Sequence, residues 1–307
     1  VVTVAYDRLG ASASGAGVRQ RASARARLLA LLPTVEQVFD VGATARVLWG
    51  GDGDAVGSEL EGLVMVRARE LSLGFDGVLE QGESERAARS LAPLLGEPVR
   101  AARVRRWGSR SVLRWDSTRV TAYVELDTAS GDGDPDPGSD LTRFTFPRDA
   151  NVGLLLFERV LGYASARAAA AGAARLAAAG LPEDAADAVA TEGAFTSAVA
   201  LFPQVDVHPH RALLLRGGVL LAWAPEPLID PIRSTPPAPG TAGVNLRGGA
   251  PGRYYGTELD LRARLTFRER TLFDLEGALL APGDALADAA GRAATAALVT
   301  ARGTVAF

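Results

Sequence analysis

Charged and apolar residues alternate along residues 256–267, which read GTELDLRARLTF. Glu258, Asp260, Arg262 and Arg264 occupy every second position, and leucine or alanine fills the positions between them. A β-strand sends successive side chains to opposite faces, whereas a helix would scatter both sets around its circumference. The pattern therefore predicts a strand with one charged face and one apolar face.

The same alternation recurs along the chain. In residues 19–32, arginine and serine share one face, and alanine and leucine share the other. The other clear cases are residues 38–50, 59–69, 71–82, 117–126, 271–281 and 298–307. Together with the segments between the remaining connections, the pattern predicts about twelve strands, each near the length of about 9 to 11 residues that a tilted membrane strand needs.

The connections between these segments alternate in length. Short turns are expected near residues 33–37, 70, 116, 204–210 and 268–270, and long polar connections at residues 9–17, 50–58, 83–102, 128–192, 224–254 and 282–294. Short turns at one end and long loops at the other are typical of outer-membrane barrels. We therefore expect residues 1–307 to form one all-β, transmembrane, antiparallel up-and-down β-barrel of about 12 strands, or about 14 to 16 if strands precede residue 1.

A soluble β-sandwich is the alternative fold, because its strands also alternate. Its outer faces would be mixed and polar, whereas the polar faces here are heavily charged with both signs. The chain is 48% hydrophobic, yet no run of about 18 uncharged residues could form a membrane helix. Lipid against the apolar faces and water against the charged faces account for both observations.

Charge and composition exclude several other classes. The net charge is −3, and arginine supplies the whole basic side, so a basic nucleic-acid surface is not indicated. The absence of cysteine excludes disulfides and thiolate metal sites. The chain opens on VVTVAYDRLG, so we expect any signal peptide to lie upstream or to have been removed.

Charged side chains would line the lumen if the apolar faces meet lipid. The candidate lining residues are Arg19, Arg21, Arg25, Arg27, Arg46, Arg67, Arg69, Arg119, Arg262, Arg264 and Arg302, with the acids Asp40, Glu59, Glu61, Asp76, Glu80, Glu125, Glu258, Asp260, Asp274 and Glu276. One interpretation is a selectivity lining, in which arginines attract anions and carboxylates set a transverse field. The other is mutual neutralisation inside a filled barrel, and a barrel of this size allows both.

Residues 128–192 form a long connection of different composition. Alanine dominates after residue 160, with few β-branched residues, which predicts one or two short helices within residues 150–192. The stretch VGLLLF at residues 152–157 is too apolar to remain unpacked in water. We therefore prefer a loop folded into or over the pore, as a constriction or plug, to an extracellular cap.

Neither a metal, a cofactor nor catalysis is predicted. Asp132, Asp134 and Asp136 in DGDPDPGSD are weak candidates for calcium, because the stretch lacks the glutamate and spacing of a helix-loop-helix site. The two histidines, His208 and His210, fall in an expected short turn, away from any extracellular groove. No nucleophile elbow or phosphate loop is present, so we do not expect an enzyme.

Five aromatic residues are expected at the membrane interface, where an amphipathic ring suits the headgroup level. They are Trp49, Trp223, Tyr254, Tyr255 and Phe307.

The C-terminal part of the chain resembles outer-membrane barrels of the alginate-export type. The stretch YYGTELDLRARLTFRERTLFDLEGALLAPGDAL and the final ARGTVAF resemble the last hairpin of such barrels. The stretches FTFPRDANVGLLLFERVLG at 144–162 and LLAWAPEPLIDP at 220–231 are similar to segments of uncharacterised barrels of this kind. The resemblance implies a conduit for an anionic saccharide, and a C-terminal strand ending at Phe307 that barrel-assembly machinery recognises.

These observations give two hypotheses for a protein of the bacterial outer membrane, with its lipid bilayer as the first partner. The favoured one is a porin-like channel that conducts anionic solutes along an arginine-lined lumen. The alternative is a barrel that conducts little and serves as a structural or docking component of an envelope complex for secretion, motility or polysaccharide export. Nucleic acid is not an expected partner.

Overall fold

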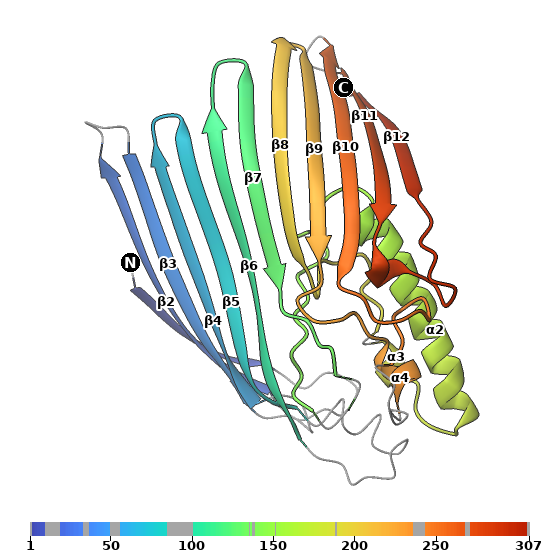
Figure 1. The fold of residues 1–307 in the computed structure, drawn as a ribbon. Coiled ribbons are helices and arrows are strands. Elements are labelled where there is room, and N and C mark those ends of the chain that lie inside the picture. The colour runs from blue at the N-terminus through green and yellow to red at the C-terminus, as the bar shows by residue number, and fades with distance from the viewer. Residues whose placement is uncertain are drawn as a thin grey trace.

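A computed structural model of the chain describes residues 2–9, 19–32, 37–49, 56–84, 101–134, 136, 139–150, 152–187, 189–235, 243–267 and 271–305. Within these residues, twelve strands form one antiparallel sheet in chain order (Figure 1). The strands are β1 (Val2–Leu9), β2 (Arg19–Leu32), β3 (Gln37–Trp49), β4 (Val56–Ala68), β5 (Leu71–Ser84), β6 (Ala102–Asp116), β7 (Val120–Ala129), β8 (Val199–His210), β9 (Leu213–Trp223), β10 (Tyr254–Phe267), β11 (Thr271–Pro282) and β12 (Ala296–Val305).

The antiparallel meander predicted from the alternation is confirmed. Each strand pairs with the next one along the chain, and the described parts of the long connections after β7, β9 and β11 gather at one end of the sheet (Figure 1). Within the described residues no pairing joins β1 to β12, so the sheet is open between them. A closed barrel and its strand number therefore stay predictions.

Two predicted boundaries are wrong. The strand expected from residue 117 begins at Val120, because residues 117–119 form a tight turn in which the Ser117 N–H donates to the Val120 carbonyl at 2.8 Å. The short turn expected at residues 204–210 lies on β8, and the chain turns only at residues 211–212. The strand accommodates Pro209 where the register with β9 shifts between Val207 and His210.

The long connections carry the helices. Between β7 and β8 lie the π-helical turn η2 (Leu156–Leu161), α2 (Gly162–Ala178) and the short α3 (Asp184–Asp187). The turns α4 (Pro231–Ser234) and η3 (Asp284–Leu286) follow β9 and β11. The alanine-rich α2 ends at Ala178, and Gly180 follows with a left-handed φ of 69°. The next N–H, of Leu181, bonds back to the Leu176 carbonyl at 3.0 Å.

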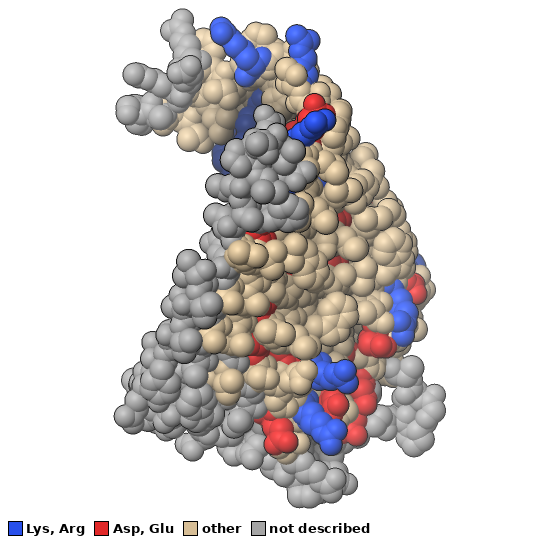
Figure 2. Space-filling model, turned by 90° about the vertical axis from the view of Figure 1, so that its left-hand side faces the viewer, with Lys and Arg blue, Asp and Glu red and all other residues tan. Residues whose placement is uncertain are grey.

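One face of the sheet exposes large apolar side chains from β2 to β12. We call this face the apolar belt; it includes Val41, Leu60, Leu73, Phe75, Leu113, Val124, Val205, Leu215, Val219, Leu259, Leu261, Leu275, Leu279 and Val299. Leu261 is 57% exposed and Val299 77% exposed. On the face seen in Figure 2, charged side chains gather towards the two ends and uncharged residues fill most of the surface between them. A water-exposed surface rarely carries so continuous an apolar area.

Aromatic residues mark both ends of the apolar belt. Trp107 and Trp223 are exposed towards the loop end, and Trp115, Phe267 and Phe273 are exposed at the short-turn end. Trp107 and Trp115 lie eight positions apart on β6, a span of about 26 Å along the strand, close to the apolar band of about 25 Å in outer-membrane barrels.

Of the five aromatic residues expected at the membrane interface, two lie together at one end of the apolar belt, and their interfacial placement stays a prediction. The Trp223 and Tyr254 rings lie 5.7 Å apart at the loop end. The prediction is wrong for Tyr255, which is fully buried on the opposite face. Side chains of Trp49 and Phe307 lie outside the described residues.

The core lies between the helical connection and the other face of β8 to β11. We call residues 152–178, which hold η2 and α2, the helical segment. Its Phe157 packs in edge contact with Phe195 and Tyr255, at ring distances of 4.7 and 5.9 Å. Leu220 from β9 and Leu280 from β11 are fully buried in the same cluster. Among the described residues, no helix is both long and apolar enough to cross a membrane.

Candidate functional site

The charged residues gather on the face of the sheet opposite the apolar belt, which we call the inner wall. The strand registers align its members in rows, for example Asp206 on β8, Arg216 on β9, Arg262 on β10 and Glu276 on β11. Because side chains alternate along each strand, every second residue of a charged segment joins this wall. The helical segment covers its loop end, on β8 to β11.

The first group of ion pairs joins β6 to β7. The Arg110 Nε atom lies 2.9 Å from Asp127 Oδ1 and 3.1 Å from Glu125 Oε1. Its Nη2 donates to Asp127 Oδ2 at 3.1 Å and to the Ala150 carbonyl at 3.3 Å. Arg110 thereby links the inner wall to Ala150, in the long connection between β7 and β8.

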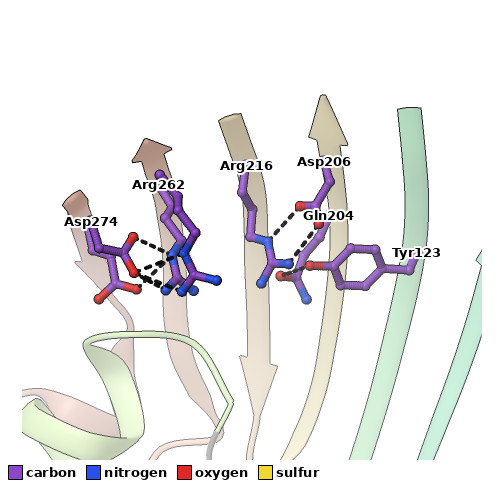
Figure 3. A network of polar contacts seen from close by, with 8 residues as sticks. Tyr123, Gln204, Asp206, Arg216, Arg262 and Asp274 are labelled. Carbon is purple, nitrogen blue, oxygen red and sulfur yellow. Dashed lines mark hydrogen bonds and ion pairs between the residues drawn. The ribbon is translucent and has the colours of Figure 1, made fainter. Parts of the chain in front are cut away.

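The second group lies on β7, β8 and β9 (Figure 3). The Arg216 guanidinium donates to both carboxylate oxygens of Asp206, at 2.6 and 2.8 Å. Its Cζ atom lies 5.4 Å from the centre of the Tyr123 ring, within cation–π range. The Tyr123 hydroxyl donates to Gln204 Oε1 at 3.0 Å. The chain thus presents a cation, an amide and an aromatic ring side by side.

The third group centres on Asp274 of β11 (Figure 3). Both Arg262 and Arg264 of β10 bind this carboxylate, and the Arg264 Nη2 to Asp274 Oδ2 distance is 2.9 Å. The Arg262 Nε also lies 3.2 Å from Glu276 Oε1. Two arginines and two carboxylates thus balance in charge here, and Asp274 is shared by both guanidinium groups.

The predicted lining residues fall into three sets. Arg262, Arg264, Asp260 and Asp274 lie on the inner wall, as do Glu59, Glu61 and Arg67 by the β4–β5 register. The prediction is wrong for Arg69 and Arg119, because Arg69 adopts a left-handed φ of 52° in the β4–β5 turn and Arg119 lies in the β6–β7 turn. The side chains outside the described residues are Arg19, Arg21, Arg25, Arg27 and Arg46.

Sequence reasoning missed five members of the network. They are Arg106, Arg110, Asp127, Asp206 and Arg216. The alternation on β6 is weak, because Arg103 and Arg105 stand on the apolar-belt side, and Asp206 fell in a segment taken for a turn. Arg216 could have been found by aligning the sequence of β9 with residues 256–267, because the alignment places Arg216 beside Arg262.

Glu258 differs from the other inner-wall carboxylates, because backbone amides satisfy it. Its Oε1 accepts from the N–H groups of Leu154 and Leu155 at 2.7 and 2.8 Å, and its Oε2 accepts from Leu156 at 2.6 Å. Its side chain is fully buried. These donors lie at the N-terminal end of η2, where free amides and the helix dipole favour an anion.

The weak metal candidates lie in a loop and do not form a shared ligand set. Asp132 and Asp134 accept from the backbone amides two positions further on, at 3.2 and 2.9 Å. Burial raises the pKa of Asp132 above its ordinary value. Within the described part of the chain, no three acidic or histidine side chains cluster in a way that could hold a metal ion.

An antiparallel sheet with an apolar belt between two aromatic rows and a charged inner wall is compatible with an outer-membrane β-barrel. Residues 189–300 match the family model of alginate export, an outer-membrane barrel family. The matched region includes β8 to β11 and most of β12, so the resemblance seen in the sequence is confirmed for this part of the chain. No curated protein matches the chain.

Proposed function

We propose that the chain is an outer-membrane conduit for anionic solutes, including acidic saccharides. The observation that carries this proposal is the inner wall on β9 and β10, where ion pairs hold Arg216, Arg262 and Arg264 in fixed positions opposite the apolar belt. Guanidinium groups fixed in this way attract anions without moving, and the neighbouring carboxylates keep the field local. The match to the alginate export family supports transport as the activity.

Closure of the sheet is part of this proposal. The registers run β1 from the short-turn end towards the loop end, and β12 from the loop end towards the short-turn end. The two edge strands therefore have the antiparallel orientation that pairing requires. Two free edges inside a bilayer would leave many backbone groups without hydrogen bonds, whereas a closed barrel satisfies them.

The helical segment narrows the conduit in this proposal. It buries the loop end of β8 to β11 with Phe157, Leu156 and Leu161, which are almost completely inaccessible. A solute would pass beside this cluster, along the inner walls of the other strands. A closed resting state with low conductance is the expected consequence.

A non-conducting docking barrel is the second candidate, and the same packing supports it. If the helical segment never moves, the lumen is filled and the long loops become binding surfaces for envelope proteins. Single-channel current in a planar bilayer separates the two candidates. Current steps with an anion-selective reversal potential, reduced in Arg262→Gln and Arg264→Gln, support the conduit. A refolded barrel without current in any variant overturns it and favours docking.

A further inference from the structure

We propose that Glu258 is the positioning residue that holds the helical segment against the inner wall, and that losing its carboxylate releases the inner end of that segment. The proposal rests on the proposed conduit only for its effect on current. We call the contact of Glu258 on β10 with the amides at the N-terminal end of η2 the clamp. It assigns Glu258 a structural role in place of the field-setting role expected for the lining carboxylates.

The first argument is chemical. Three consecutive amides, those of Leu154, Leu155 and Leu156, donate to one fully buried carboxylate. Neither η2 nor α2 has a side-chain cap of its own at its N-terminal end. Helices usually satisfy such amides with a nearby serine, threonine or aspartate. Here the cap comes from a strand more than a hundred positions later in the chain.

The second argument is steric. Gly153 adopts a left-handed φ of 73°, and a Cβ atom there would lie 2.7 Å from Leu220 Cδ2 and 3.0 Å from Glu258 Oε1. Only glycine tolerates both the backbone conformation and this approach. The chain is therefore shaped at residue 153 to bring the next amides onto the wall.

The third argument is the position of a second anchor. Arg175, in the last turn of α2, donates from Nη1 to the carbonyl oxygens of Ile232 and Arg233 at 2.8 and 3.1 Å, and from Nη2 to that of Thr235. These acceptors lie in and after α4, in the connection between β9 and β10. The helical segment is thus tied at two separate ends. Releasing Glu258 would free the inner end while the outer end stays attached.

The test combines hydrogen exchange with single-channel recording on the refolded full chain. In Glu258→Ala, we expect the amides of residues 154–156 to exchange faster, with β9 and β10 unchanged. Losing charge-assisted hydrogen bonds of this kind should raise the population of the released segment about 10-fold or more. Open probability should rise with it. Glu258→Gln, which keeps one acceptor oxygen, should lie between Glu258→Ala and the wild type, and it tests the same clamp if Glu258→Ala does not insert.

Glu226→Ala is the matched control, because this half-exposed loop glutamate pairs with Arg253 outside the wall. It should change neither exchange at residues 154–156 nor current. Unchanged exchange at these amides in both Glu258 variants would overturn the clamp. Faster exchange without current in any protein would support the clamp and overturn the conduit, so the two failures are distinguishable.

Discussion

Arg216 and Asp206 face each other across the β8–β9 hairpin and form two nearly parallel hydrogen bonds, Nε to Oδ1 at 2.6 Å and Nη2 to Oδ2 at 2.8 Å. This fork geometry holds a planar guanidinium in one orientation. The Tyr123 ring beneath it limits movement further. The wall therefore presents a cation whose position is set by three neighbouring strands.

Replacing Arg216 by glutamine should lower anion selectivity. The Asp206 carboxylate is buried and would remain on the wall without its main partner, and a buried carboxylate left in this way costs about 1 to 3 kcal/mol of stability. The reversal potential under a salt gradient measures the first effect. Arg253→Gln, at an exposed loop position, should leave the reversal potential unchanged. Equal reversal potentials for wild type and Arg216→Gln would count against a selectivity role.

Replacing Asp274 by asparagine should act in the opposite direction. Arg262 and Arg264 both bind this carboxylate, so its loss leaves two cations with one remaining acid, Glu276. We expect stronger anion selectivity and larger current for anions. Comparing Asp274→Asn with Arg264→Gln in the same bilayer checks the sign. Shifts in the same direction for both variants would contradict the wall as the source of selectivity.

An arginine in place of Leu275 should hinder insertion. Leu275 lies on the apolar belt, two positions from Phe273 of the aromatic row, and is 52% exposed. A charged residue on the lipid face costs about 2 to 4 kcal/mol at the midplane and about 0 to 1 kcal/mol near the interfaces, so we expect a cost between these limits. Folding yield into vesicles, followed by heat-dependent gel mobility, measures the effect. The control is Leu272→Arg on the same strand, whose register places it on the other face. Equal yields for both variants would refute the assignment of the two faces.

The loop aspartate Asp230 should make the loop end of the sheet more stable at low pH. Its carboxylate is fully buried beneath α4, accepts from the Arg233 N–H at 3.0 Å, and burial raises its pKa. Because the folded state then holds the proton more tightly, stability falls as pH rises from the ordinary aspartate pKa of about 3.9 through the raised value. Asp230→Asn should remove this loss. Limited proteolysis of residues 224–253 between acidic and neutral pH measures it.

Asp288 supplies the contrast, because the Arg292 and Ala290 amides hold the pKa of its exposed carboxylate below the ordinary value. Its contribution is present above the ordinary pKa and is lost as pH falls through the lowered one. Asp288→Asn should therefore weaken the connection between β11 and β12 at neutral pH and have less effect in acid. If pH changed the stability of both variants in the same direction, burial would not be the cause of the pH dependence at Asp230.

The sequence predicts best where alternation is strict. Residues 256–267 correspond to β10 almost end to end, because charge on every second residue fixes both the strand and its faces. Tyr255 shows where the alternation of side chains between the two faces fails. Gly256 has a φ of 140° and the register with β9 shifts at this point, so the ring turns from the belt to the buried side. A bulge of this kind depends on tertiary contacts that alternation does not encode.

The contact of Glu258 with the helical segment was equally out of reach. The residue belongs to a charged alternation, and nothing near it in the chain indicates that backbone amides will satisfy it. Its donors lie 102 to 104 positions earlier. Such a pairing emerges only when the topology brings the two segments together.

This separation has a consequence for biogenesis. The amides at residues 154–156 are made long before β10, so the segment that contains them lacks its Glu258 partner until most of the chain has been synthesised. It can settle only after the C-terminal strands have been laid into the sheet. Assembly of this protein should therefore proceed with a vacant interior, and filling of that interior should be the last event, reporting that the C-terminal strands are in place.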